Sequence, residues 1–146
     1  MNDLNSGKHL ILVDGSGFIF RAYHALPPLT KSDGTPTGAV SGYCNMLFKL
    51  INELKEFKAT HIGVVFDHKD KTFRSNIYPD YKANRPPPPD DLVPQFQLIR
   101  DATEAFGFLA IDKKGYEADD IIATLAKNAT DDGAIVTIFS LSLIHI

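Results

Sequence analysis

Short apolar runs alternate along this chain with stretches of helical spacing, and this alternation constrains the fold more than any other feature. Three runs have the length and β-branched content of buried strands: His9 to Val13, Ile62 to Phe66 and Ala134 to Phe139. The run Phe108 to Ile111 is shorter. Strands that alternate with helices predict an α/β fold, with a mainly parallel central sheet covered by helices on both faces.

The segments between the apolar runs have helical spacing. Gly38 to Leu54 places apolar residues at i, i+3, i+4 and i+7, which predicts an amphipathic helix. Pro94 suits the first turn of a helix that ends near Gly107, and Glu117 to Asn128 predicts another helix. We expect the first strand to stop at a turn formed by Asp14-Gly15.

Bulk properties narrow the class of protein. The chain has 146 residues, enough for one sizeable core, and its single cysteine, Cys44, excludes an internal disulfide framework. No apolar run approaches the roughly 20 residues needed to span a bilayer. We therefore expect a cytoplasmic protein with no membrane partner, made of a flexible tail at residues 1–7 and one domain at 8–140.

The net charge of −3 hides a basic stretch. Five basic residues against two acidic ones lie between Lys69 and Arg85, namely Lys69, Lys71, Arg74, Lys82 and Arg85. Clustered Lys and Arg favour a phosphate-rich partner such as nucleic acid, although a solvated charged loop has the same composition. Pro86 to Pro89 then predicts a rigid, extended spacer within the domain.

Acidic residues stand where predicted strands end and where a predicted helix begins. Asp14 and Asp67 follow two strands, and Glu117, Asp119 and Asp120 open a helix. Each feature alone is common, since Asp-Gly forms turns and acids complement the helix dipole. Together they predict one pocket beyond the carboxyl ends of the strands. Oxygen-only ligands select Mg²⁺, or Mn²⁺, over zinc.

Several motifs, in order, resemble the 5′ nuclease domain at the N-terminus of bacterial DNA polymerase I, from residue 8 to residue 140. They are Val13-Asp14-Gly15, Arg21-Ala22-Tyr23-His24-Ala25, Val64-Val65-Phe66-Asp67, Lys71-Thr72-Phe73-Arg74, Tyr81-Lys82, Asn84-Arg85-Pro86 and Gly115-Tyr116-Glu117-Ala118-Asp119-Asp120. The resemblance implies a PIN-like, resolvase-like core. It also implies a magnesium-dependent 5′-3′ exonuclease or flap endonuclease that acts on branched, nicked or 5′-flapped DNA in replication and repair.

The resemblance also implies a role for individual residues. Two or more metal ions would be held by Asp14, Asp67, Glu117, Asp119 and Asp120. DNA would be contacted by Arg21, Arg74, Tyr81, Lys82 and Arg85. Lys82 and Arg85 would also be catalytic, by stabilising charge on a phosphodiester attacked by metal-activated water. A polymerase domain can follow in the parent chain.

The end of the chain departs from the family pattern. In the family, the strand at Ala134 to Phe139 leads into an aspartate-bearing segment and later into a helix-hairpin-helix region, whereas here Leu141 to Ile146 follows. The sequence Leu-Ser-Leu-Ile-His-Ile matches the translation of a transposon end used to prepare sequencing libraries. We therefore expect a non-native, sequencing-adaptor-derived tail on an incomplete domain with little activity, rather than a frameshift or a genuine apolar tail.

Three other functions stay open from the sequence. The carboxylates also suit a PIN-type ribonuclease, although the basic, aromatic and proline-rich stretch favours the flap nuclease. The chain could instead be a catalytically impaired fragment that only binds nucleic acid weakly. Asp14-Gly15-Ser16-Gly17 after a strand suggests a nucleotide-binding regulatory domain, but it lacks the full G-x-G-x-x-G spacing.

Overall fold

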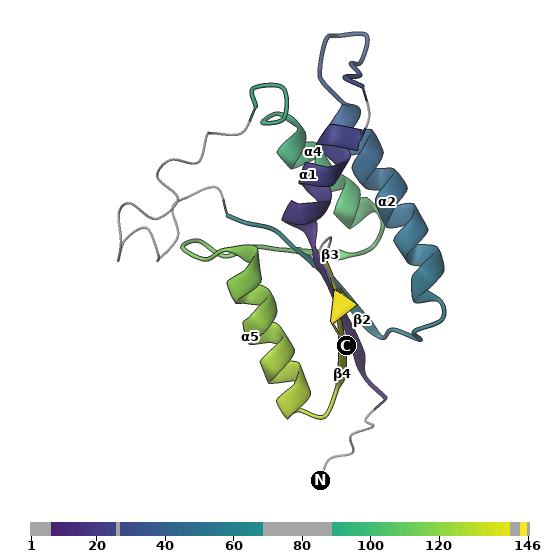
Figure 1. The fold of residues 1–146 in the computed structure, drawn as a ribbon, viewed down its shortest axis with the longest axis vertical. Coiled ribbons are helices and arrows are strands. Elements are labelled where there is room, and N and C mark those ends of the chain that lie inside the picture. The colour runs from purple at the N-terminus through teal and green to yellow at the C-terminus, as the bar shows by residue number, and fades with distance from the viewer. Residues whose placement is uncertain (1–6, 26, 69–88, 141–143, 146) are drawn as a thin grey trace.

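The computed structural model describes residues 7–25, 27–68, 89–140 and 144–145. The elements follow in the order β1 (His9–Asp14), α1 (Gly15–Ala25), α2 (Gly38–Leu54), β2 (His61–Val65), α4 (Gln95–Ala105), β3 (Leu109–Ile111), α5 (Ala118–Asp131), β4 (Ile135–Phe139) and β5 (Ile144–His145) (Figure 1). The strands and helices predicted from spacing agree with β1, α2, β2, α4, β3, α5 and β4 within a few residues, whereas spacing does not predict α1 or β5.

The strands form one sheet in the order β3-β2-β1-β4-β5. Strand β1 pairs in parallel with β2 on one side and with β4 on the other, and β3 continues the parallel pattern next to β2. Among the strands of the described residues, only β5 runs antiparallel, against β4. The predicted mainly parallel sheet is therefore confirmed. Because Asp14 lies opposite Val65 in the register, β1 and β2 end together at one rim.

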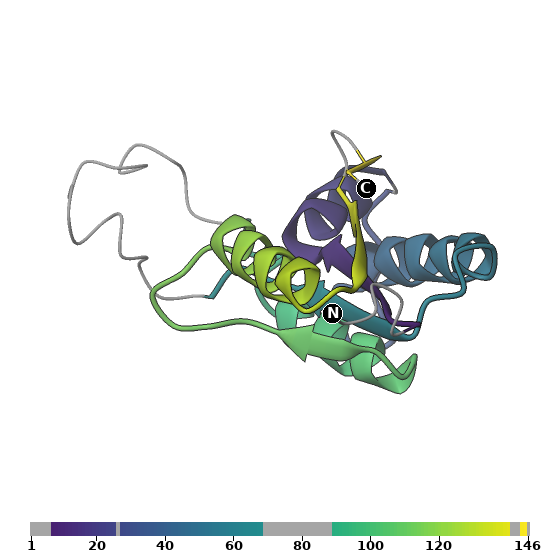
Figure 2. The same ribbon diagram turned by 90° about the horizontal axis from the view of Figure 1, so that it is seen from below.

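Helices cover both faces of the sheet, as predicted. On one face, Ile11, Val13 and Val64 belong to a core cluster that includes residues of α1, α2 and α4. On the other face, Leu12 and Val65 pack with α5. Figure 2 shows α5 on one side of the sheet, with α2 and α4 on the side away from α5. Alternate residues of the same strand thus enter two separate apolar layers.

The predicted turn at Asp14-Gly15 is wrong, because α1 begins directly at Gly15. Gly15 is buried, and a Cβ atom built there would lie 2.5 Å from Cε1 of Phe66 and 2.8 Å from Cγ1 of Val64. The glycine therefore allows α1 to leave the sheet in close contact with β2. The spacing of Phe18, Ile19 and Ala22, which are all buried, is the helical signal.

Some predictions fall outside the described residues. These are the tail up to residue 6, the basic stretch 69–85, the proline spacer up to residue 88, and residues 141–143 and 146. The interpretation of Leu141 to Ile146 as a non-native tail stays a prediction.

Buried and half-buried polar contacts join the helices and strands. The Tyr43 hydroxyl lies 2.6 Å from Oγ1 of Thr103, which links α2 to α4 inside the core. The His9 ring lies between the carbonyl oxygen of Phe57, at 2.7 Å from Nδ1, and Oγ1 of Thr137, at 2.8 Å from Nε2. The start of β1 is thereby tied to the middle of β4 and to the turn that follows α2.

We predict that Gly15→Ala lowers the free energy of unfolding by about 1–3 kcal/mol, because the new methyl group meets a packed aromatic ring. Gly63→Ala is the matched control. Its Cβ would lie 2.8 Å from Cδ1 of Ile111, the far end of a flexible side chain. We expect that variant to stay within about 1 kcal/mol of the parent. Equal losses in urea unfolding would contradict the close-approach argument.

Candidate metal centre

Asp14 is the last residue of β1 and lies directly before α1. Its Oδ1 atom accepts a hydrogen bond of 3.1 Å from the backbone N–H of Gly17, in the first turn of α1. The carboxylate is half-buried and faces the positive end of a helix dipole. It is therefore held at the rim by the helix that the sheet leads into.

Asp67 joins three elements at the same rim. Its backbone N–H donates to Oγ of Ser16 in α1, at 2.8 Å. Its Oδ1 atom accepts from the backbone N–H of Ala118, the first residue of α5, at 2.7 Å. A side chain that follows β2 thus satisfies one of the N–H groups that a helix leaves unpaired at its start. This bond fixes the start of α5 against the end of β2.

The three acids at the start of α5 lie in different settings. Glu117 is the N-cap residue, and its N–H donates to Oδ2 of Asp120 at 3.1 Å within a capping box. Both side chains are half-buried, whereas Asp119 is exposed. Glu117 and Asp120 therefore stabilise the helix start in this structure, and any metal-binding role would be additional to capping.

Burial and two neighbouring carboxylates raise the proton affinity of Asp14. The pKa of Asp14 is raised above its ordinary value, chiefly because burial disfavours the charged form, and further by the negative charges of Asp119 and Asp67. The hydrogen bond from Gly17 acts in the opposite direction. Asp67 and Asp119 are thus each close enough to Asp14 to repel its charged form.

The five acids do not form a closed ligand set. Within residues 7–25, 27–68 and 89–140, no three His, Cys, Asp or Glu side chains are grouped closely enough to hold one ion. The structure brings Asp14 and Asp67 to one rim with the start of α5, as the strand ends predicted. The assignment of all five as metal ligands stays a prediction.

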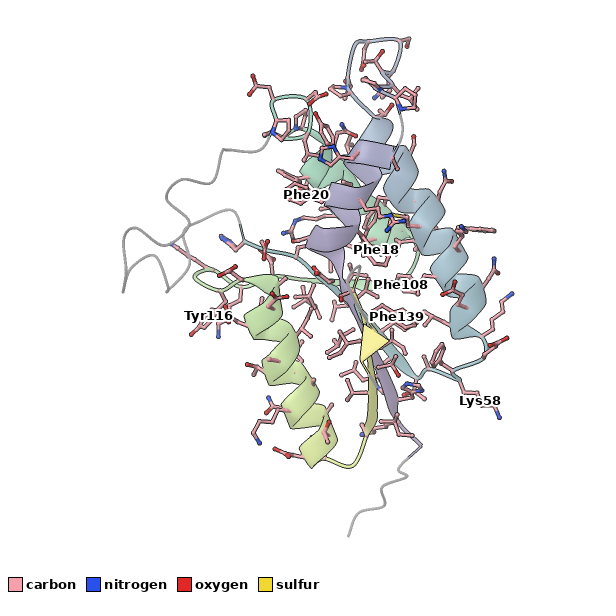
Figure 3. All side chains as sticks on the ribbon, viewed as in Figure 1. Phe18, Phe20, Lys58, Phe108, Tyr116 and Phe139 are labelled. Atoms are coloured by element: carbon pink, nitrogen blue, oxygen red, sulfur yellow. The ribbon has the colours of Figure 1, made fainter. Side chains whose placement is uncertain are left out.

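Of the predicted DNA contacts, only Arg21 lies within the described residues. It is exposed on α1, in a shallow hollow shared with Phe20, His24 and Ala25. Phe20, labelled in Figure 3, stacks on His24 with the ring centroids 6.3 Å apart. The remaining predicted contacts, Arg74, Tyr81, Lys82 and Arg85, lie outside the described part of the chain.

Sequence reasoning missed two residues near the rim. The Oγ atom of Ser16 accepts a hydrogen bond from the Asp67 N–H, and no local sequence pattern predicts this contact. Asp112 directly follows β3, much as Asp14 ends β1 and Asp67 comes shortly after β2. Its position after a predicted strand could therefore have marked it as a residue near the rim. Its side chain pairs with Arg100 of α4 and lies near His68.

A family model described as the 5′-3′ exonuclease N-terminal, resolvase-like domain matches residues 9–141 of the chain. The chain belongs to the 5′-3′ exonuclease family. The resemblance drawn from the motifs is confirmed. Among the described residues of this family member, none of the helices combines the length and apolar character that crossing a membrane requires.

The curated relatives of this 5′-3′ exonuclease domain are longer proteins. DNA polymerase I of Rhizobium leguminosarum is 58% identical over 142 residues, which cover 94% of this chain and 14% of the polymerase. A 5′-3′ exonuclease of Aquifex aeolicus is 44% identical over 133 residues, covering 91% of this chain and 45% of that protein. The chain therefore spans less than half the length of either relative.

Solved structures share the fold. The zinc-bound 5′-exonuclease of bacteriophage T5 has a TM-score of 0.63 and 23% identity, covering 94% of this chain and 58% of that one. A T5 flap endonuclease solved with DNA and metal ions has a TM-score of 0.61 and 24% identity, covering 92% and 56%. At this identity the likeness supports the resolvase-like α/β core.

We predict that Asp14→Asn is more stable than the parent at neutral pH in the presence of a chelator. A raised pKa means that the native state holds the Asp14 proton more tightly than the unfolded state, whose Asp14 pKa is near 3.8. The free energy of unfolding therefore falls as the pH rises from that value through the pKa of the folded state. It stays at the lower value at higher pH. Asparagine removes the charge and keeps an oxygen for the Gly17 N–H. Thermal unfolding between pH 3 and pH 8 measures the effect.

Asp33→Asn is the matched control for charge. The pKa of Asp33 is lowered, chiefly by the hydrogen bond from the Thr35 N–H, so its charged form is favoured in the native state. That variant should not gain stability at neutral pH. A melting temperature of Asp14→Asn below the parent's at pH 7 would show that the Asp14 charge stabilises the fold.

Proposed function

We propose that this chain is part of a divalent-metal-dependent 5′-3′ exonuclease or flap endonuclease that hydrolyses phosphodiesters in branched, nicked or 5′-flapped DNA. One observation carries the proposal: the hydrogen bond from the Ala118 N–H to Asp67 holds the end of β2 against the start of α5. Asp14, Asp67 and the acids of α5 consequently lie at one rim of the sheet. Family membership gives this rim its expected chemistry.

The donor set fits a hard divalent cation. All five side chains, from Asp14, Asp67, Glu117, Asp119 and Asp120, offer carboxylate oxygen, which suits Mg²⁺ or Mn²⁺. The raised pKa of Asp14 reflects burial and repulsion that a nearby cation would relieve. When bound, such ions supply Lewis-acid activation of water and of the phosphodiester.

The chain's own residues would orient this chemistry. Asp67 is fixed by Ser16 on its backbone side and by Ala118 on its carboxylate side, so it points to the rim without a change of conformation. Arg21 is exposed on α1, the helix that leaves the same rim, where it would neutralise phosphate.

The remaining assignments rest on the motif resemblance. Arg74 and Tyr81 would contact DNA, and Lys82 and Arg85 would also stabilise charge developing on the phosphate. The T5 flap endonuclease was solved with DNA and metal ions, which supports a DNA substrate for this family member. The polymerase relatives support a parent chain in which a polymerase domain follows.

We predict that Asp67→Asn in the full-length native protein lowers the turnover of a 5′-flapped duplex by about 100-fold or more with Mg²⁺, because a ligand and its charge are lost. DNA affinity should change little, since phosphate contacts remain. Asp101→Asn is the matched control: this exposed residue of α4 accepts only from Gln97 among the described residues, at 2.9 Å.

Parallel assays on single-stranded RNA separate the flap nuclease from a PIN-type ribonuclease. Faster cleavage of the RNA than of the flapped DNA would overturn the proposed substrate. Wild-type turnover by Asp67→Asn would remove that residue from the site.

A further inference from the structure

Asp112 connects two parts of the molecule that meet beside the candidate metal centre. It follows β3, and its Oδ1 atom accepts a hydrogen bond from Nη1 of Arg100 in α4 at 3.2 Å. Its Oδ2 atom lies 3.7 Å from Nε2 of His68, the residue after Asp67. The two oxygens of one carboxylate therefore face an α4 side chain and the segment that leaves β2.

The Arg100 contact is itself held in place. The guanidinium lies over the ring of Phe66, with Cζ 4.9 Å from the ring centroid, and only 26% of the Arg100 side chain is exposed. Phe66 is buried, and its N–H donates to the carbonyl of Ile111 at 2.8 Å. A guanidinium restrained by a ring and a carboxylate loses less freedom in each hydrogen bond than an exposed lysine does.

The pair formed by Arg100 and Asp112 is less exposed to solvent than a surface ion pair. The Asp112 side chain is 29% exposed, whereas Lys127 and Asp131 at the far end of α5 are 75% and 63% exposed. Solvent screens the exposed pair more strongly and leaves both of its side chains more freedom. Asp112 can therefore restrict the movement of Arg100 and His68 more than Asp131 restricts that of Lys127.

Each of the three consecutive residues after β2 has its own contacts with other elements. Phe66 is held by β3 and Arg100, Asp67 by Ser16 and Ala118, and His68 lies against Asp112. Asp67 is exposed, so its carboxylate direction depends on these contacts and not on burial. Fixing both chain neighbours of Asp67 narrows the directions in which its side chain can point.

We propose that Asp112 is a positioning residue for the metal centre: its carboxylate, bonded to Arg100 through one oxygen and lying beside His68 through the other, restrains the segment after β2 and so keeps Asp67 hydrogen-bonded to the start of α5. The consequence for metal binding rests on the proposed function. The consequence for the hydrogen bonds of Asp67 does not, and it can be measured without metal.

The experiment compares Asp112→Ala with Asp131→Asn, which removes the same charge from an exposed pair. Amide hydrogen exchange is measured in the metal-free 146-residue chain. Mn²⁺ affinity is then measured by electron paramagnetic resonance, and thermal unfolding reports on overall stability. Asp112→Asn, which keeps an oxygen for Arg100, replaces the alanine variant if that variant does not fold.

In Asp112→Ala we expect the amides of Asp67 and Ala118 to exchange faster, by a larger factor than those of Leu12 and Val13 in β1. We expect Mn²⁺ affinity to fall about tenfold, the lower end for residues that orient metal ligands. Asp131→Asn should change neither quantity. A uniform change across all amides would show a purely structural role and overturn the proposal.

Failure of this inference and failure of the proposed function give different results. If the parent chain binds Mn²⁺ no better than Asp67→Asn does, the metal centre is wrong, and the amide exchange still decides the role of Asp112. If Mn²⁺ binding depends on Asp67 but the Asp67 and Ala118 amides are unchanged in Asp112→Ala, the positioning role is wrong and the metal centre stands.

Discussion

Strand β1 is buried on both faces and paired on both edges, and the rest of the structure depends on this burial. Ile11 and Val13 pack into one helical layer and Leu12 into the other, each with no more than 1% of its surface exposed. Apolar burial of this kind is the main favourable contribution to folding. Because β1 pairs in parallel with β2 and β4, its end fixes the position of the rim that carries Asp14 and Asp67.

The rim combines stabilising contacts with charge repulsion. Asp67 stabilises the start of α5 by accepting the Ala118 N–H, whereas burial and neighbouring carboxylates raise the pKa of Asp14. A site that repels itself without a cation is less stable than the same rim with neutral side chains. The surrounding contacts, from Ser16 to the close packing at Gly15, hold these acids together despite that repulsion.

The sequence was sufficient to predict those parts of the fold that depend on a local pattern. The strands at β1, β2 and β4 follow from β-branched apolar runs, and the parallel sheet follows from their alternation with helices. Helix α1 was missed because Asp14-Gly15 has turn chemistry, while its glycine in fact serves close packing against Phe66. The hydrogen bond that Asp67 donates to Ser16 and the one that it accepts from Ala118 each join residues 51 positions apart, so no local pattern could reveal them. Nor could spacing show that Glu117 and Asp120 cap their helix.

We propose above all that Asp14, Asp67 and the start of α5 form one cation-binding rim. Paramagnetic broadening of backbone amides by substoichiometric Mn²⁺ tests it most directly, because broadening falls steeply with distance from the ion. The account predicts that the amides of Gly15 to Gly17, Asp67 and Ala118 to Asp120 broaden first and together. Earliest broadening around Asp131 and Asp132, at the opposite end of α5, would contradict it.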